Sequence, residues 1–127
     1  MSKHTLVVDD SHVIRRITSS LLCAFDFEPS EADSPAAALT ACATRMPALV
    51  ILDWLMPAND KHAMDSLECL QSLRRLPGGN EPVVLYCMTE HDPKEFDRAI
   101  RAGADDVIIK PYDRDMLHRK LIATGLL

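Results

Sequence analysis

The sequence has few aromatic residues, little glycine and no excess of positive charge. Three Phe, two Tyr and one Trp among 127 residues argue against a stacking platform for single-stranded bases. With 14 Lys and Arg against 19 Asp and Glu, the net charge is −5, whereas a nucleic-acid-binding surface needs clustered positive charge. The four glycines form neither a P-loop nor a G-x-G-x-x-G turn. We therefore expect no nucleic-acid partner and no nucleotide binding through those motifs.

Long apolar runs and paired cysteines are also missing. No apolar run approaches the roughly 20 residues of a membrane span, and the first residues lack the apolar stretch of a signal peptide. The four cysteines have unrelated spacings without a C-x-x-C pair, which predicts small buried hydrophobic residues in a reduced compartment. They are Cys23, Cys42, Cys69 and Cys87. We expect one cytoplasmic globular domain without a membrane partner.

Short apolar runs rich in β-branched residues recur along the chain. They show no polar alternation, which is typical of strands buried on both faces of a parallel sheet. These predicted strands cover residues 5–8, 49–52, 83–87 and 106–109. Residues 27–31 form a weaker candidate, and Pro29 places it at an edge of the sheet, because proline lacks an amide donor.

Segments with helical periodicity lie between the predicted strands. Ser11, Ser34, Asp92 and Asp113 are predicted N-caps, and a third helix ends at residues 77–79. The residues predicted to face inward are Val13, Ile14, Ile17, Leu21 and Leu22; then Leu67, Leu70, Leu73 and Leu76; then Phe96, Ala99 and Ile100; and last Met116, Leu117 and Leu121. The alternation predicts an α/β fold, a (βα)5 doubly wound parallel sheet.

Charged side chains stand at three predicted strand ends. Asp9 and Asp10 follow the first strand, Asp53 follows the third and Lys110 ends the fifth. If the strand order is 2-1-3-4-5, strands one and three are neighbours and the three acids converge. An acidic pair after one strand is usually only a turn, but four such residues on one edge indicate a site. Clustered carboxylates cannot all stay ionised without raised pKa values or a cation, and hard oxygen ligands favour Mg²⁺.

Four segments together resemble a response-regulator receiver domain, and the resemblance covers the whole chain. They are Leu6-Val7-Val8-Asp9-Asp10-Ser11, Ile51-Leu52-Asp53-Trp54-Leu55-Met56-Pro57, Ala102-Gly103-Ala104-Asp105 and Lys110-Pro111. The resemblance implies the order 2-1-3-4-5 of flavodoxin-like and CheY-like folds. It also implies a single receiver domain over 1–127 without an output domain. Residues 13–16, 77–79 and 110–114 are similar to stand-alone, chemotaxis-type receivers.

The resemblance also implies roles for individual residues. Asp53 would accept a phosphoryl group from a histidine kinase. Asp9, Asp10, Asp53 and the Leu55 backbone carbonyl would hold Mg²⁺, and Lys110 would pair with the phosphoryl oxygens. The Lys110-Pro111 peptide is typically cis in the family. The expected partners are the kinase and a downstream protein, and the protein is a phospho-acceptor rather than an enzyme, monomeric with a dimer as the alternative.

The switch positions depart from the family pattern. Receivers usually carry Thr or Ser at the end of the fourth strand, where counting back from Lys110 places Met88. Methionine has no hydroxyl. Thr89 follows, but strand alternation turns it to the opposite face unless the strand has ended. Val107 replaces the usual aromatic residue. Either Met88 merely packs and Asp53 still accepts phosphate, or the switch is altered.

The loop over residues 58–66 is the second departure, being some five residues longer than usual and lacking the expected glycine. A tolerated surface insertion is the simpler interpretation, with His62 solvated; a changed docking surface beside Asp53 is the alternative.

Three classes of function follow from these patterns. The first is a stand-alone receiver in two-component signalling, in chemotaxis or motility as one setting. The second is a phosphorylation-independent interaction module, motivated by Met88. The third is a small enzyme. Haloacid-dehalogenase-like phosphatases need a second Asp where Leu55 stands, and flavodoxin-like FMN binding needs a Ser/Thr/Gly-rich loop that residues 10–13 do not supply.

Overall fold

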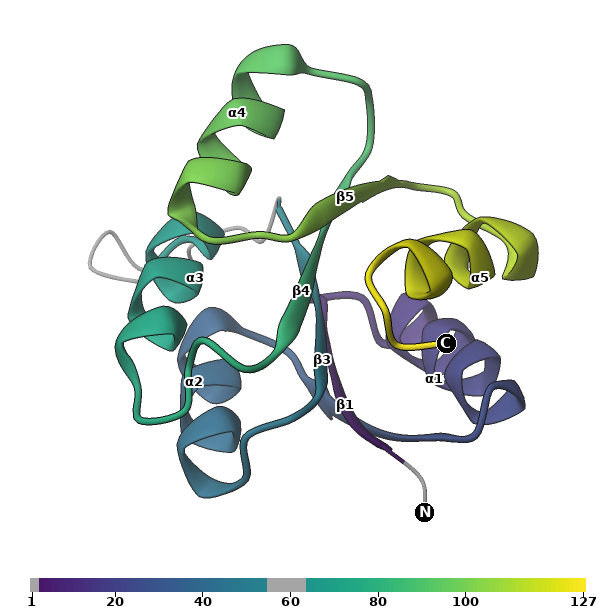
Figure 1. The fold of residues 1–127 in the computed structure, drawn as a ribbon, viewed down its shortest axis with the longest axis horizontal. Helices are drawn as coiled ribbons and strands as arrows, with labels where there is room; N and C mark the ends of the chain where they lie inside the picture. The colour runs from purple at the N-terminus through teal and green to yellow at the C-terminus, as the bar shows by residue number, and fades with distance from the viewer. Residues whose placement is uncertain (1–2, 55–63) are drawn as a thin grey trace.

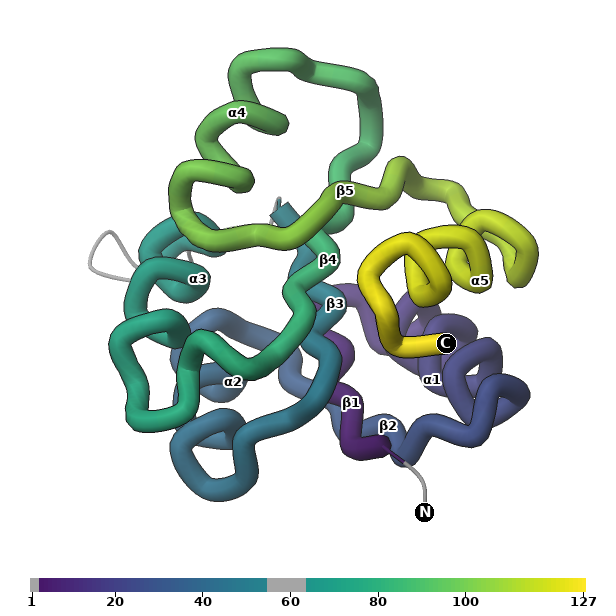
Figure 2. Tube along the Cα trace, in the orientation of Figure 1, coloured from purple at the N-terminus to yellow at the C-terminus, as the bar shows by residue number. Residues whose placement is uncertain are grey.

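A computed structural model describes residues 3–54 and 64–127. Five strands within these residues form one parallel sheet in the order β2-β1-β3-β4-β5, which confirms the predicted topology (Figures 1 and 2). The strands are β1 (Lys3–Val8), β2 (Phe27–Ala32), β3 (Leu49–Asp53), β4 (Val83–Met88) and β5 (Asp106–Ile109). Pro29 lies in β2, at the edge of the sheet as predicted.

Capping residues mark where the helices begin. The helices are α1 (His12–Ala24), α2 (Pro35–Thr44), α3 (Ser66–Arg75), α4 (Pro93–Ala102) and α5 (Arg114–Ala123). The four predicted N-caps all accept a backbone N–H with their side chains, and Asp65 does the same for α3. Such caps satisfy amide groups that the first helical turn leaves unpaired.

The helices cover both faces of the sheet. Helices α1 and α5 lie on one face, and α2, α3 and α4 lie on the other (Figures 1 and 2). Each face has its own core of strand and helix side chains. Strand β3 is buried along its whole length, as expected for a central strand of a doubly wound sheet. No helix within the described ranges has both the length and the apolar character needed to cross a bilayer.

The predicted inward face of α1 is partly wrong. Val13 and Ile17 are 63% and 52% exposed, whereas Thr18, Ser19 and Leu22 are buried. The buried side is centred on Thr18 because the Thr18 hydroxyl pairs with the Tyr112 hydroxyl, which removes the cost of burying a polar group. The buried face that apolar periodicity predicts for α1 is therefore slightly rotated about the helix axis from the observed one.

The inward face of α4 also needs correction. Phe96 and Ile100 are 39% and 38% exposed, while Ala99 between them is fully buried. A small residue at the contact lets the helix approach the sheet closely, and its larger neighbours remain at the rim. Cys23 is exposed, contrary to the prediction, whereas the other three cysteines are buried, and all four are free thiols.

Arg74, near the end of α3, connects four segments of the fold. Its guanidinium donates to the backbone carbonyls of Gly79 at 3.0 Å, Pro82 at 2.7 Å and Gly103 at 2.6 Å. It also pairs with Asp105 at 3.0 Å, whose carboxylate accepts the Val84 N–H in β4. The Arg74 side chain is only 14% exposed, and Gly79 and Pro82 among its acceptors are buried.

We expect Arg74→Met to lower the free energy of unfolding by about 3 kcal/mol, because it leaves several carbonyl groups without their charged donor. Urea denaturation followed by circular dichroism measures the change. The matched control is Arg75→Met, because Arg75 is the next residue and is exposed, where substitutions cost less than about 0.5 kcal/mol. Equal losses in the two variants would contradict the anchoring role of Arg74.

Candidate phosphoryl-acceptor site

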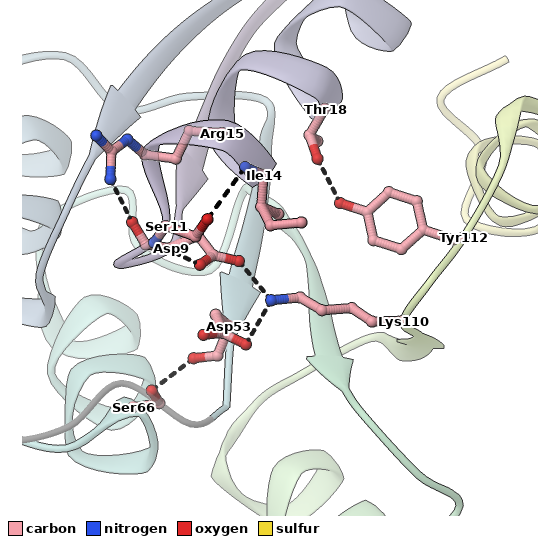
Figure 3. Close-up of polar contacts among 9 residues, drawn as sticks. All are labelled: Asp9, Ser11, Ile14, Arg15, Thr18, Asp53, Ser66, Lys110 and Tyr112. Carbon is pink, nitrogen blue, oxygen red and sulfur yellow. Dashed lines mark hydrogen bonds and ion pairs between the residues drawn. The ribbon is translucent and has the colours of Figure 1, made fainter.

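Three strands bring the predicted site residues to one edge of the sheet. Asp9 and Asp10 follow β1, Asp53 ends β3 and Lys110 follows β5 directly. Strands β1 and β3 are hydrogen-bonded neighbours, with Val8 beside Leu52. Their carboxyl ends therefore place Asp9 next to Asp53, as Figure 3 shows.

Lys110 bridges the two buried carboxylates. Its ammonium group donates to Asp53 Oδ1 at 2.9 Å and also to Asp9 Oδ2 (Figure 3). The Asp9 and Asp53 side chains are 5% exposed, and the Lys110 side chain is 16% exposed. One cation thus stands against two carboxylates in a site that is largely shielded from solvent.

Backbone contacts hold these residues in place. The Lys110 N–H donates to the Met88 carbonyl at 2.7 Å, which ties the end of β5 to the end of β4. The Ser11 N–H donates to Asp9 Oδ1 at 2.9 Å. The Lys110-Pro111 peptide is cis. The lysine and the first carboxylate are therefore both held at strand ends by backbone hydrogen bonds.

The electrostatics of the site oppose ionisation of Asp53. Burial raises the pKa of Asp53, and the charges of Asp9 and Asp10 raise it further, against the lowering effect of Lys110. Burial acts to lower the pKa of Lys110, but its hydrogen bonds to Asp9 and Asp53 outweigh that effect and raise it. The acid cluster therefore carries more negative charge than one lysine offsets, and additional positive charge would stabilise it.

The three acids also have the arrangement of a metal site. Asp9, Asp10 and Asp53 each offer an oxygen, and these atoms lie within 4.8 Å of one another. Asp10 is exposed while the other two are buried, so the cluster opens to solution on one side. Carboxylate oxygens fit Mg²⁺, which binds through a few carboxylates and keeps several waters. Leu55, the predicted carbonyl ligand, lies outside the described residues.

The predicted switch residues surround the end of β4. Met88 is the last residue of β4 and is buried in the core on the α2–α4 side, where Val107 also packs. Strand β4 ends there, so Thr89 no longer belongs to the strand; it is exposed and lines a cavity together with Lys110. The predicted hydroxyl position thus holds a buried thioether, and an exposed hydroxyl follows one residue later.

The long loop is described only at its end. Residues 58–63, with His62 among them, lie outside the described residues. Of the predicted 58–66 segment, Asp65 caps α3, and the Ser66 hydroxyl donates to the Asp53 backbone carbonyl at 2.6 Å. The end of this loop therefore anchors the backbone of Asp53.

Several residues around the site were not predicted from the sequence. Ser66 holds the Asp53 carbonyl, and Arg15 donates to the Asp9 carbonyl at 2.8 Å. Thr18 and Tyr112 form a partly buried hydroxyl pair. The Asp65-Ser66 pair just before an apolar run is a capping signal that could have located Ser66. Nothing in the sequence pairs Thr18 with a residue 94 positions away.

Comparisons with known proteins identify the family of the chain. The sequence profile of the response regulator receiver domain matches residues 5–122, and the chain belongs to that family. It is 28% identical to the phosphate regulon transcriptional regulatory protein PhoB of Klebsiella pneumoniae over 88% of this chain and 47% of that protein. The chain thus spans about half the length of the curated relatives it matches.

Solved structures share the fold. The chemotaxis protein CheY4 of Vibrio cholerae superposes with a TM-score of 0.88 at 24% identity, covering 97% of this chain and 98% of that one. The receiver domain of the sensor histidine kinase PA1611 of Pseudomonas aeruginosa, which has a magnesium ion coordinated in its active site cleft, gives 0.84 at 16% identity, with 97% of both chains covered. Receiver domains are signalling modules of two-component systems rather than enzymes, and they interact with histidine kinases and downstream targets.

Proposed function

We propose that this protein is a response regulator whose Asp53 accepts a phosphoryl group from a histidine kinase. The observation that carries the proposal is the Lys110 ammonium group held between the carboxylates of Asp9 and Asp53 at the carboxyl edge of the sheet. A buried carboxylate beside a fixed ammonium group and an open acidic cluster is suited to receive a phosphoryl group, whose oxygens need positive partners.

The transfer is a single displacement at phosphorus. An Asp53 oxygen forms the new P–O bond while the P–N bond to the kinase histidine breaks, and the imidazole leaves with the electron pair of that bond and takes up a proton. Lys110, already 2.9 Å from Asp53 Oδ1, is placed to pair with the phosphoryl oxygens. Asp9 and Asp10, together with Asp53, would hold Mg²⁺, which would offset negative charge during the transfer.

The proposal includes how the signal leaves the molecule. A groove of about 380 Å³ lies along α4, β5 and α5, with Phe96, Val107 and Met116 among its lining residues. Phe96 and Ile100, both on α4, are 39% and 38% exposed. We assign the downstream protein partner to this face. We further propose that the protein is a stand-alone receiver and acts in the cytoplasm as a monomer. Chemotaxis or motility is one setting for this role.

Incubation with acetyl phosphate and Mg²⁺ tests phosphoryl acceptance without the kinase. The P–O bond to acetate breaks, acetate leaves, and the protein mass should rise by about 80 Da, which is one phosphoryl group. Chelation of the metal should suppress the adduct. A protein whose mass stays unchanged over hours in the presence of Mg²⁺ would overturn the proposal.

Met88 favours a second candidate function, a phosphorylation-independent interaction module. Its buried thioether ends β4 and offers no hydroxyl group that could follow a phosphoryl group. Beryllofluoride, which mimics a phosphoryl group on aspartate, separates the two candidates. A signalling switch predicts shifted amide resonances across α4 and α5, and an interaction module predicts resonances there that stay where they were.

Trp54 reports on the metal site, since it follows Asp53 directly and is the only tryptophan. Its indole N–H is buried without a hydrogen-bond partner among the described residues. We expect Mg²⁺ to change its fluorescence, because a divalent charge alters the field around the ring. Asp10→Asn, which removes one proposed ligand, should weaken the response. An unchanged signal up to tens of millimolar Mg²⁺ would contradict a metal site here.

A further inference from the structure

A partly buried pair of hydroxyl groups joins α1 to the segment that carries Lys110. The Thr18 Oγ1 and Tyr112 OH atoms are 2.6 Å apart (Figure 3). Thr18 is 1% exposed, and Tyr112 is two residues after Lys110, between β5 and α5. This contact lies outside the acid cluster, and the proposed transfer chemistry does not use either hydroxyl.

Open space borders the Lys110 side chain on the same side. A cavity of about 390 Å³ lies between α1 and the segment after β5. Its walls are Ile14, Ile17, Thr18, Thr89, Lys110, Pro111 and Tyr112. Close packing normally restricts a side chain from all directions, but here one side of Lys110 faces the cavity. The position of its ammonium group therefore depends on its two carboxylate partners and on its backbone.

The backbone at Lys110 is fixed from two directions. Toward β4, the Lys110 N–H donates to the Met88 carbonyl at 2.7 Å. Toward α1, the Tyr112 hydroxyl is hydrogen-bonded to the Thr18 hydroxyl. Pro111 and Tyr112 line the same cavity as Lys110, so the segment after Lys110 has room to move when that bond is absent.

We propose that Tyr112 and Thr18 are positioning residues that hold the Lys110 ammonium group at Asp53 by anchoring the segment after β5 to α1. The inference rests on the proposed function for its effect on phosphoryl transfer. Packing alone does not call for two facing hydroxyls, because an apolar pair of the same shape would be nearly as stable. The hydroxyl pair instead fixes the orientation of the segment after β5 relative to α1. This matters because a small displacement of a group that acts on the reacting atoms can lower the reaction rate substantially.

Two shape-conserving variants test the inference through the rate of phosphorylation by acetyl phosphate. Tyr112→Phe and Thr18→Val each remove one hydroxyl. We expect each to lower the rate about tenfold, equivalent to about 1.4 kcal/mol, and the double variant to lose no more than either alone. In a Lys110→Ala background, Tyr112→Phe should have no further effect. A wild-type rate in both single variants, or the same loss with and without Lys110, would overturn the inference.

Two matched substitutions separate positioning from the general effect of a buried hydroxyl. The Thr5 hydroxyl in β1 is fully buried without a hydrogen-bond partner in the described ranges, so Thr5→Val should leave the rate unchanged. Thr18→Ser keeps the hydroxyl and should retain most of the wild-type rate. Loss of rate in Thr5→Val equal to that in Thr18→Val would assign the effect to the fold rather than to Lys110.

A second readout does not depend on phosphorylation. In the metal-free protein, the ammonium protons of Lys110 should exchange slowly with water in ¹⁵N NMR, because they are donated to Asp9 and Asp53. We expect faster exchange in Tyr112→Phe. If wild type is not phosphorylated but exchange still responds, the proposed function fails and the positioning role stands. Unchanged exchange in a folded Tyr112→Phe protein would overturn the positioning role.

Discussion

Asp53→Asn should abolish phosphoryl incorporation from acetyl phosphate, reducing it below detection. The amide keeps the size of the carboxylate, and its carbonyl oxygen still accepts from Lys110, which donates to Asp53 Oδ1 at 2.9 Å in the wild type. The neutral amide is a poor nucleophile, so the acceptor is lost while the surroundings persist. Intact mass spectrometry in saturating Mg²⁺ makes the comparison.

The control for this variant is Asp26→Asn. Asp26 is exposed and adopts a positive φ of 65°, a conformation that asparagine tolerates well. It lies after α1, away from the carboxyl edge of the sheet, so the adduct should form at the wild-type rate. An Asp53→Asn protein that gains the same mass as Asp26→Asn would show that another residue accepts the phosphoryl group.

Lys110→Ala is expected to slow phosphorylation by about 100-fold, the usual cost of removing a fixed charge from the site of a developing anion. The substitution removes the ammonium group that pairs with both Asp9 and Asp53. It leaves two buried carboxylates without their cation, so the metal-free protein should also lose stability. Rates are therefore compared in saturating Mg²⁺ and at a temperature where circular dichroism shows a folded protein.

Lys120→Ala is the matched control, because Lys120 also forms an ion pair with a carboxylate, Asp106 on β5, at 3.1 Å. This pair lies on the β5–α5 side and outside the acid cluster. We expect Lys120→Ala to phosphorylate at nearly the wild-type rate. If the two lysine variants lose phosphorylation rate equally, the loss in Lys110→Ala comes from the change in overall charge and not from a lost contact with the transferred group.

The strands and caps were predictable because they depend on local signals. Continuous apolar runs identified strands buried on both faces, and Ser11 and Asp113 marked helix starts through side chains that accept nearby N–H groups. The convergence of Asp9 and Asp53 followed from strand order, since adjacent parallel strands end at one edge. For these elements, the sequence pattern is enough to predict which residues are neighbours in the structure.

The faces of α1 and α4 were harder to predict because they depend on packing between distant segments. Periodicity favoured Val13 and Ile17 as buried, but the Tyr112 hydroxyl makes Thr18 a suitable buried residue instead. Ala99 is buried because its small side chain allows close approach of α4. The contacts that support the site also depend on segments that are distant in the sequence. Ser66 reaches the Asp53 carbonyl from across a loop, which no spacing rule specifies.

The two predicted switch residues at the end of β4 lie in different surroundings. Met88 fills core space beside β5, and Val107 packs in the same core. Thr89 instead lies on the cavity wall with Lys110 and Tyr112. A conformational response to phosphorylation at this point would involve the α1 side of the sheet as well as the α4 side. The beryllofluoride comparison distinguishes these regions, because it follows each backbone amide separately.

The most direct test of the account is the chemical location of the phosphoryl group. Sodium borohydride reduces an aspartyl phosphate to homoserine, which leaves a permanent mark at the acceptor. After reaction with acetyl phosphate and Mg²⁺, followed by borohydride and proteolysis, peptide sequencing by mass spectrometry should find homoserine at position 53. Homoserine at another position, or aspartate retained at 53 in a protein that has gained phosphoryl mass, would contradict the central claim that Asp53 is the phosphoryl acceptor.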